Sequence, residues 1–243
     1  MAKKGEKKSK KRLAAAKVVS ILRKENTWTI RTKPGPHNKK NSIPLGVALR
    51  DLIKIAKTMK ETKYILNQGA VEVDGRTVKD YGFPVGIFDI IAIKPENKTY
   101  RVLFNKKGKL VLAEEKQGSK EKLCKVVGKS AGKKGIVQVQ TSDGRTFPMK
   151  KTSVKVGDSL LVSVPSQKVV KELKVEEGSS ALVIAGSNVG ILCTVKKVTP
   201  GTMRRPKLVE LESQDKVFQT TEENIFIVGE KKPLLEVIGG HKK

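Results

Sequence analysis

The side chains of this sequence that could do chemistry are overwhelmingly basic. Lys and Arg number 51 against 24 Asp and Glu, which gives a formal charge of +27 on 243 residues. Ammonium and guanidinium groups neutralise phosphates and release bound counterions without reading a base sequence. The composition therefore predicts a polyanionic partner. Nucleic acid fits better than a membrane surface, because the longest apolar runs fall far short of the ~20 residues that cross a bilayer.

The sequence shows no pattern typical of catalysis or metal binding. Cys124 and Cys193 lie far apart without a Cys-x-x-Cys pair, and the two histidines, His37 and His241, stand near opposite ends. This spacing predicts neither a zinc site nor a disulfide, and we expect both cysteines to be small core hydrophobes. The glycine-rich run 128–135 lacks the spacing of a nucleotide phosphate loop. No cofactor, metal or catalytic residue is therefore predicted, and the protein is not expected to be an enzyme.

A strongly basic segment opens the chain. Residues 1–41 carry fourteen basic residues against only Glu6 and Glu25. Such a stretch repels itself and is not expected to bury a core, so it is either a solvated tail or, as we prefer, an arm that orders when RNA neutralises it. Apolar residues at helical spacing predict a short helix over residues 13–23. Trp28 is equally compatible with stacking on a base and with packing against the protein.

Residues 43–99 have the pattern of a small module that mixes helices and strands. Pro44 occupies the favoured first position of a helix and precedes an apolar-periodic run. A second helix is expected over residues 61–67 and ends at Gly69. Two alternating runs around Asp74-Gly75 predict a β-hairpin over residues 71–78, and residues 90–93 predict another strand.

From Tyr100 the pattern changes to short, evenly spaced β-type runs. The expected strands cover residues 100–105, 110–113, 123–127, 136–141, 146–149 and 159–164, with a second hairpin at Asp143-Gly144. After Gly178 the same texture predicts strands at 181–185, 191–198, 208–212 and 225–228. We therefore expect a central all-β domain and a further small β module.

The module of residues 44–93 resembles the alpha-L RNA-binding motif found in ribosomal proteins, some tRNA synthetases and some pseudouridine synthases. The matching positions are Leu49, Leu52, Lys63, Ile65, Gly69, Val71, Val73, Asp74, Gly75 and Val78. The resemblance implies phosphate contacts by the basic residues around the helices, namely Arg50, Lys54, Lys57, Lys60 and Lys63. The alternative is that these side chains only solvate a helix face.

Residues 180–195 resemble the KOW motif of ribosomal proteins and transcription elongation factors. The resemblance implies a tight loop, with Gly186, Asn188 and Gly190, whose backbone approaches RNA. Cys193 stands where the motif usually has Gly, and Val189 where it often has Lys. A plain β-turn in a small barrel is therefore the alternative for this loop.

Several further strings resemble the archaeal and eukaryotic (e-type) small-subunit ribosomal protein four family over nearly the whole chain. They are Pro34-Gly35-Pro36-His37, Val73-Asp74-Gly75-Arg76, Phe83-Pro84-Val85-Gly86-Ile87-Phe88-Asp89-Ile90-Ile91, Cys124-Lys125-Val126, Asp143-Gly144-Arg145-Thr146 and Asn224-Ile225-Phe226-Ile227-Val228-Gly229. The family implies an α+β protein with a basic N-terminal arm (1–42), an alpha-L RNA-binding domain (43–99), a central all-β domain (100–174) and a C-terminal KOW SH3-like β-barrel with a tail (175–243).

The same resemblance implies a structural constituent of the small ribosomal subunit that binds and stabilises folded rRNA and takes part in translation. The rRNA contact is expected in the 5′ domain, and neighbouring small-subunit proteins are expected as further partners. The short arm and modest length favour an archaeal member. No apolar segment follows the Lys-rich residues 1–12, so they do not resemble a secretory signal and a cytoplasmic location is expected.

The residues expected to contact RNA are basic side chains of the arm, the alpha-L module and the central domain, together with the KOW loop. They are Lys10, Lys11, Arg12, Arg31, Lys33, His37, Lys39, Lys40, Arg50, Lys54, Lys57, Lys60, Lys63, Arg76, Lys133, Lys134 and Arg145, with Gly186, Asn188 and Gly190 in the loop. For Lys133 and Lys134 the alternative is simple exposure to solvent.

Three other functions fit parts of the pattern. A synthetase or pseudouridine synthase would need a larger catalytic domain, which this sequence does not supply. A free RNA-binding or transcription-elongation module is the main alternative and should expose an apolar patch for a polymerase. A basic domain that binds any polyanion predicts steep salt dependence without a preference for RNA. Neither a membrane nor a small-molecule substrate is an expected partner.

Overall fold

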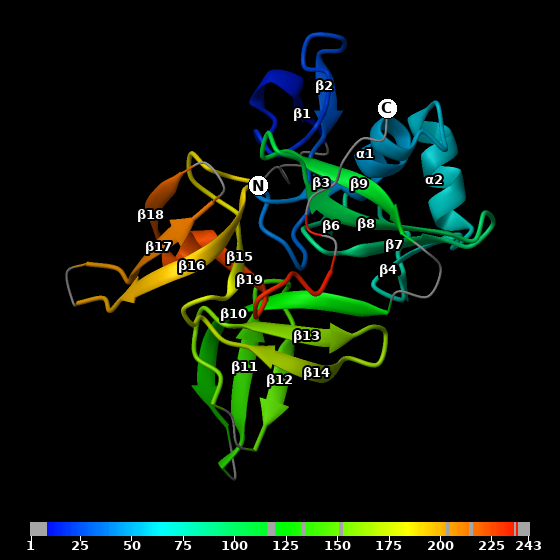
Figure 1. Cartoon of the computed structure of the whole chain (residues 1–243). Coiled ribbons are helices and arrows are strands. Elements are labelled where there is room, and N and C mark those ends of the chain that lie inside the picture. The colour runs from blue at the N-terminus through cyan, green and yellow to red at the C-terminus, as the bar shows by residue number, and fades with distance from the viewer. Residues whose placement is uncertain are drawn as a thin grey trace, which may run out of the picture. The chain divides into compact units, whose positions relative to one another are not determined.

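The protein is mostly β-structure with a few short helices (Figure 1). The computed structural model describes residues 9–115, 120–132, 135–150, 153–202, 205–213, 216–235 and 237. The chain forms two compact units, the first of residues 1–102 and 109–119 and the second of residues 103–108 and 120–243.

The N-terminal segment contains a short antiparallel pair, β1 (Ser9–Lys11) with β2 (Trp28–Ile30). The turn η1 (Arg12–Ala14) follows β1. Ala15 and Val19 are buried, so the expectation that this segment buries no core is wrong.

The helix predicted over residues 13–23 is also wrong. The guanidinium of Arg23 donates hydrogen bonds to the backbone carbonyls of Leu13, Ala15 and Ala16, at 3.2, 2.9 and 3.0 Å. These carbonyls would otherwise accept from amides four residues further along a helix. An arginine side chain thus satisfies the backbone here in place of helical hydrogen bonds.

Two short helical segments follow and lie beside one another (Figure 1). β3 (Ile43–Pro44) leads into α1 (Leu45–Val47), which continues as the π-helix η2 (Ala48–Ile53). Pro44 is the residue just before the first helix rather than its first residue. The second predicted helix is confirmed as α2 (Met59–Asn67).

The sheet of the first unit has the strand order β5-β4-β7-β8-β9. Its members are β4 (Val71–Val73), β5 (Arg76–Thr77), β7 (Ile90–Ile93), β8 (Lys98–Phe104) and β9 (Leu110–Glu115), and β6 (Pro84–Val85) pairs separately with β3. The hairpin predicted at Asp74-Gly75 is confirmed, with φ of 51° and 71° at the turn, as in a type I′ turn. The strands predicted near residues 100 and 110 are confirmed, but they extend this sheet instead of the next one.

The central sheet of the second unit has the order β12-β11-β10-β13-β14. Its members are β10 (Glu121–Ala131), β11 (Val137–Thr141), β12 (Thr146–Met149), β13 (Ser159–Ser163) and β14 (Lys168–Leu173). The pairing of β10 with β11 shifts register between Val126 and Gly128. Such a bulge bends a strand, and Figure 1 shows β10 passing from its partner β13 to its partner β11 as the sheet turns. The bent sheet encloses a core that includes Cys124, Val139 and Leu160.

The C-terminal sheet has the order β18-β17-β16-β15-β19. Its members are β15 (Ser180–Val183), β16 (Leu192–Thr199), β17 (Leu208–Glu212), β18 (Val217–Thr221) and β19 (Ile225–Gly229), with the turn η4 (Glu222–Asn224) before the last strand. Both cysteines are buried, Cys124 in the central sheet and Cys193 in β16, as predicted. Strands β14 and β18 were not predicted, because most of their residues are exposed or half-buried and their apolar alternation is weak.

A buried lysine ties the two sheets of the second unit together. The ammonium of Lys125 donates hydrogen bonds to the backbone carbonyls of Glu222, Glu223 and Ile225, at 2.8, 2.8 and 2.6 Å. Removal from water lowers the pKa of Lys125 to about 8. Lys125 therefore joins β10 to the η4 turn and the start of β19.

Candidate nucleic-acid interface

Exposed lysines surround the turn between η2 and α2. Lys54 ends η2 with a φ of 65°, and Lys57, Lys60 and Lys63 follow on or just before α2. All four side chains belong to exposed residues. Four exposed lysines therefore stand within residues 54–63, at the corner that this turn and α2 form.

A capping box fixes the start of α2. The hydroxyl of Thr58 accepts a hydrogen bond from the amide of Glu61 at 3.3 Å, and the Glu61 carboxylate accepts from the amides of Lys57 and Thr58 at 2.8 and 3.3 Å. The two backbone hydrogen bonds lower the pKa of Glu61. The amides at the helix start are thus satisfied by the side chains of Thr58 and Glu61, and none of these hydrogen bonds uses a lysine side chain.

Lys33 and Lys63 meet at one aromatic ring. Their ammonium nitrogens lie 5.9 and 4.8 Å from the centroid of Tyr81, within the range of a cation–π contact. Lys33 also pairs with Asp80 at 2.9 Å. Two residues predicted independently, one in the arm and one on α2, are therefore brought together.

A second group of cations gathers around β1. Burial, followed by the positive charges of Arg31, Arg23 and Lys39, lowers the pKa of Lys10. Three of these four residues were predicted to contact RNA, and Arg23 was not. A bound phosphate would relieve the mutual repulsion of the group.

Arg12 and Arg50 make internal contacts. The Arg12 side chain is buried and donates hydrogen bonds to the carbonyl of Leu22 at 2.6 Å and to Glu25 at 3.3 Å. The guanidinium of Arg50 donates to both carboxylate oxygens of Asp51, at 2.7 and 3.0 Å, and this raises the pKa of Arg50. An RNA contact of Arg12 would therefore have to compete with these internal partners.

His37 is also directed inward, although it was predicted to contact RNA. Its Nε2 lies 2.9 Å from the carboxylate of Asp89, and both side chains are buried. The same carboxylate accepts a hydrogen bond from the amide of Gly86 at 2.8 Å. The imidazole lies directly over Gly86, where a β-carbon would collide with the ring. His37 thus fastens the end of the arm to the turn before β7.

Arg145 belongs to a buried ion cluster in the central sheet. Its Nε and the ammonium of Lys122 both lie 3.2 Å from one oxygen of Asp143. Burial alone would raise the pKa of Asp143, but Lys122, the hydroxyl of Thr141 and Arg145 outweigh it and lower that pKa. Burial raises the pKa of the neighbouring Cys124 thiol well above its usual value. An RNA contact of Arg145 would therefore have to compete with this internal ion pair.

The other predicted basic residues fall into two groups. Lys11, Lys39, Lys40 and Arg76 are exposed and Arg31 is half-buried. Lys133 and Lys134 lie outside the described residues.

The loop between β15 and β16 has two different ends. Gly186 is exposed, whereas Gly190 is buried with a φ of 86°. A β-carbon at Gly190 would lie 2.5 Å from the carbonyl oxygen of Asn105, and one at Gly108 would lie 2.9 Å from Val189 Cβ. The open side of Gly190 is therefore filled by the β8–β9 loop, which explains why an apolar Val189 suits this place better than Lys.

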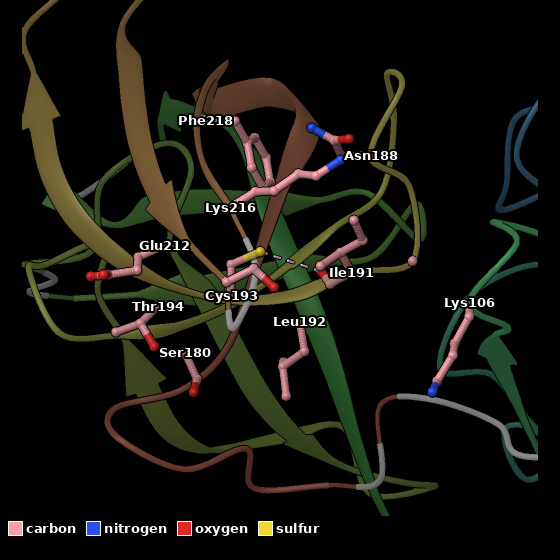
Figure 2. Close-up of a pocket in the computed structure, with 12 residues that line it drawn as sticks. Lys106, Ser180, Asn188, Ile191, Leu192, Cys193, Thr194, Glu212, Lys216 and Phe218 are labelled. Atoms are coloured by element: carbon pink, nitrogen blue, oxygen red, sulfur yellow. Dashed lines mark hydrogen bonds between the residues drawn. The ribbon is translucent and has the colours of Figure 1, made fainter.

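A pocket of about 630 Å³ lies beside this loop (Figure 2). It is lined by Lys106, Ser180, Asn188, Gly190, Ile191, Leu192, Cys193, Thr194, Glu212, Ser213, Lys216 and Phe218. Of the predicted site residues, Asn188 and Gly190 belong to it. The lysines and Phe218 were missed, although the run Lys106-Lys107-Gly108-Lys109 is a basic turn that could have indicated Lys106.

Two negative findings apply to the described part of the chain. No cluster of three or more His, Cys, Asp or Glu side chains there could hold a metal ion. No helix there combines the length and apolar character that a membrane span requires.

Comparison with known proteins decides the family. A family model described as ribosomal family S4e matches residues 96–169, and a model of the RS4NT domain matches residues 4–40. Small ribosomal subunit protein eS4 of Methanosphaera stadtmanae is 38% identical over 240 residues, which is 98% of this chain and 99% of that protein. The chain belongs to the ribosomal family S4e.

Other S4e proteins support the same assignment. The eS4 protein of Archaeoglobus fulgidus is 36% identical over 93% of this chain and 97% of its own. The crystal structure of the 30S ribosomal protein S4e from Thermoplasma acidophilum matches with a TM-score of 0.67 and 35% identity, over 78% of this chain and 95% of that one. These S4e relatives are archaeal, and the family resemblance seen in the sequence is confirmed.

Proposed function

We propose that this S4e protein is a structural constituent of the small ribosomal subunit that binds and stabilises folded rRNA through phosphate-backbone contacts. The observation that carries the proposal is the corner of exposed lysines between η2 and α2, Lys54, Lys57, Lys60 and Lys63. Groups of this kind neutralise phosphate without base readout. Its relatives are named as small-subunit ribosomal proteins, which supports the same role in translation, in the cytoplasm and beside neighbouring subunit proteins.

The contact surface we propose uses exposed and half-buried cations of the first unit and leaves out the largely buried Arg12, His37 and Arg145. It comprises Lys10, Lys11, Arg31, Lys33, Lys39, Lys40, Arg50, Lys54, Lys57, Lys60, Lys63 and Arg76. Trp28, which is 58% exposed and lies opposite Lys11, is available to stack on a base at the edge of this surface. No residue is assigned a catalytic role.

The domain organisation we propose follows the sheets. A basic arm up to residue 42 precedes an alpha-L domain, and the strand order adds β8 and β9 to the sheet of that domain. The central β domain then covers the sheet from β10 to β14, and the sheet from β15 to β19 is the KOW barrel.

Competition binding tests the function. The purified protein is titrated with a small-subunit rRNA 5′-domain transcript against tRNA and heparin, over a range of salt concentrations. We expect the rRNA to win by orders of magnitude at high salt, because a shaped phosphate surface retains affinity that simple counterion release loses. Equal competition by all three polyanions would refute a specific rRNA function.

A further inference from the structure

We propose that the pocket beside the β15–β16 loop holds a single unstacked nucleotide of the bound RNA. This inference rests on the proposed rRNA function and adds a defined site to it. The pocket volume of about 630 Å³ lies within the range of small-molecule sites. The pocket can therefore enclose a ligand, whereas the lysines of the helical corner are exposed.

Loops and strands of the second unit build the pocket together. Lys106 comes from the β8–β9 loop and Asn188 from the β15–β16 loop, whereas Lys216 immediately precedes β18 and Phe218 lies within it. Because Gly190 has no side chain, the β8–β9 loop can pack against it, and this brings Lys106 to the pocket. The role we propose for Gly190 is thus to let the β8–β9 loop pack closely, and not to contact RNA itself.

The lining supplies one group for each part of a nucleotide. Phe218 is half-buried and presents an aromatic ring to stack against a base, and the Asn188 amide can both donate and accept hydrogen bonds at a base edge. Lys106 and Lys216 are exposed and can each neutralise a phosphate. Figure 2 shows Phe218, Lys216 and Asn188 toward one end of the pocket and Lys106 toward another.

The charge of the pocket favours an anionic ligand. Its lining includes two lysines and one acid, Glu212. Its floor includes the apolar side chains of Ile191, Leu192 and Cys193, of which Cys193 is almost fully buried. A flat apolar ring joined to a phosphate matches this combination better than a free inorganic anion, which would make no use of Phe218 or the apolar floor.

The test uses the full chain, labelled with ¹⁵N, and single-stranded RNA tetranucleotides as the probe. Titration at moderate salt is followed by NMR at the backbone amides of Gly190 and Ser213, next to the pocket. We expect these amides to shift on binding, and we expect the apparent affinity at them to fall about tenfold in Phe218→Leu and in Lys216→Ala, because base–aromatic stacking and phosphate pairing are both lost.

Matched controls come from neighbouring positions outside the pocket lining. Val217→Ala changes the exposed residue before Phe218, and Lys196→Ala removes an exposed lysine of β16. Both should bind like the wild type. If Phe218→Leu fails to fold, Asn188→Ala and Lys216→Ala provide the same test at two other residues of the lining.

The outcomes separate this proposal from the proposed function. If the wild type prefers rRNA but the pocket variants bind tetranucleotides as the controls do, the pocket proposal is refuted and the rRNA function stands. If duplex RNA shifts the same amides as strongly as single strands, the site does not select an unstacked nucleotide and the proposal is also refuted. If rRNA shows no advantage over heparin, the proposed function fails whatever the pocket variants show.

Discussion

The helical corner and the central sheet use the same residue type for opposite purposes. Lys57 and Lys60 at the corner are exposed to solvent, whereas Lys122 and Lys125 of β10 are buried and bound to acceptors of the protein. An exposed ammonium can neutralise a phosphate and release counterions from RNA, whereas a buried one must be paired to offset its lost hydration. Basic composition alone therefore does not locate a binding surface.

Removing the buried carboxylate should cost the most stability. Asp143→Asn leaves Lys122 and Arg145 without their shared anion in the protein interior. We expect the free energy of unfolding to fall by about 3–5 kcal/mol, measured by urea denaturation at pH 7. The matched control is Asp80→Asn at the more exposed pair with Lys33, which should cost less than about 1 kcal/mol. Equal costs at both sites would contradict the distinction between buried and exposed pairs.

The buried Lys125 should give the protein a distinctive alkaline pH dependence. Its pKa is about 8 in the folded protein and near 10.5 when unfolded, so between these values the unfolded chain binds more protons at this residue. Stability contributed by Lys125 therefore rises as the pH goes from 8 to 10.5. We expect the unfolding free energy of the wild type, minus that of Lys125→Met, to increase by on the order of 3 kcal/mol across that window.

The pH profile has an internal control. Lys168→Met removes an exposed lysine of β14, so the same subtraction should stay flat with pH. A flat difference for Lys125→Met as well would show that this ammonium is not held in a low-dielectric site.

Changing the corner lysines should alter RNA binding with little effect on folding. In the triple variant Lys57→Ala, Lys60→Ala and Lys63→Ala, the dependence of log affinity on log salt should become shallower by about 2, because each lost phosphate contact removes ~0.7 to 0.9. Filter binding to the 5′-domain transcript at several salt concentrations measures this slope.

Lysines neutralised by nearby acids provide the comparison. Lys94 pairs with Glu72 at 2.9 Å and Lys98 with Glu96 at 3.1 Å. Their double alanine variant should leave the salt slope almost unchanged. The proposed role of the corner would be lost if both sets of substitutions changed the slope equally.

The smallest effect is expected at the capping box. Thr58→Ala removes the hydroxyl that accepts from the amide of Glu61 and should lower the unfolding free energy by about 1 kcal/mol. Thr199→Ala, at the exposed end of β16, should change it far less. Thermal unfolding of the two variants gives the comparison. The RNA affinity of Thr58→Ala should fall only to the extent that the first turn of α2 unfolds.

Local signals in the sequence predicted much of the fold. The Asp74-Gly75 turn, the helix over α2 and most strands of the three five-stranded sheets were found because turn chemistry and apolar alternation act over a few residues. The assignment of β8 and β9 to a sheet was not predictable in this way, because it depends on pairing between distant segments. The helix predicted over residues 13–23 failed because hydrogen bonds from Arg23 replace the helical ones.

The candidate site was predictable only in part. The corner lysines were predicted from the resemblance to the alpha-L motif, but exposed and buried cations look alike in a sequence. Arg12 and Arg145 therefore appeared as RNA contacts although each is used internally. Phe218 and Lys216 were missed because the pocket that they line forms only when strands and loops from distant parts of the sequence come together.

The packing of Gly190 against Asn105 has a consequence for folding during synthesis. A growing chain releases its N-terminal parts first, at roughly 5–20 residues per second, so the β8–β9 loop leaves the synthesising ribosome on the order of ten seconds before Gly190 does. During that interval the loop lacks its contacts with Val189 and Gly190. The β8–β9 loop is therefore expected to become fully packed only when the C-terminal sheet has formed. In a nascent chain stalled before Gly190, a protease should still cleave this loop.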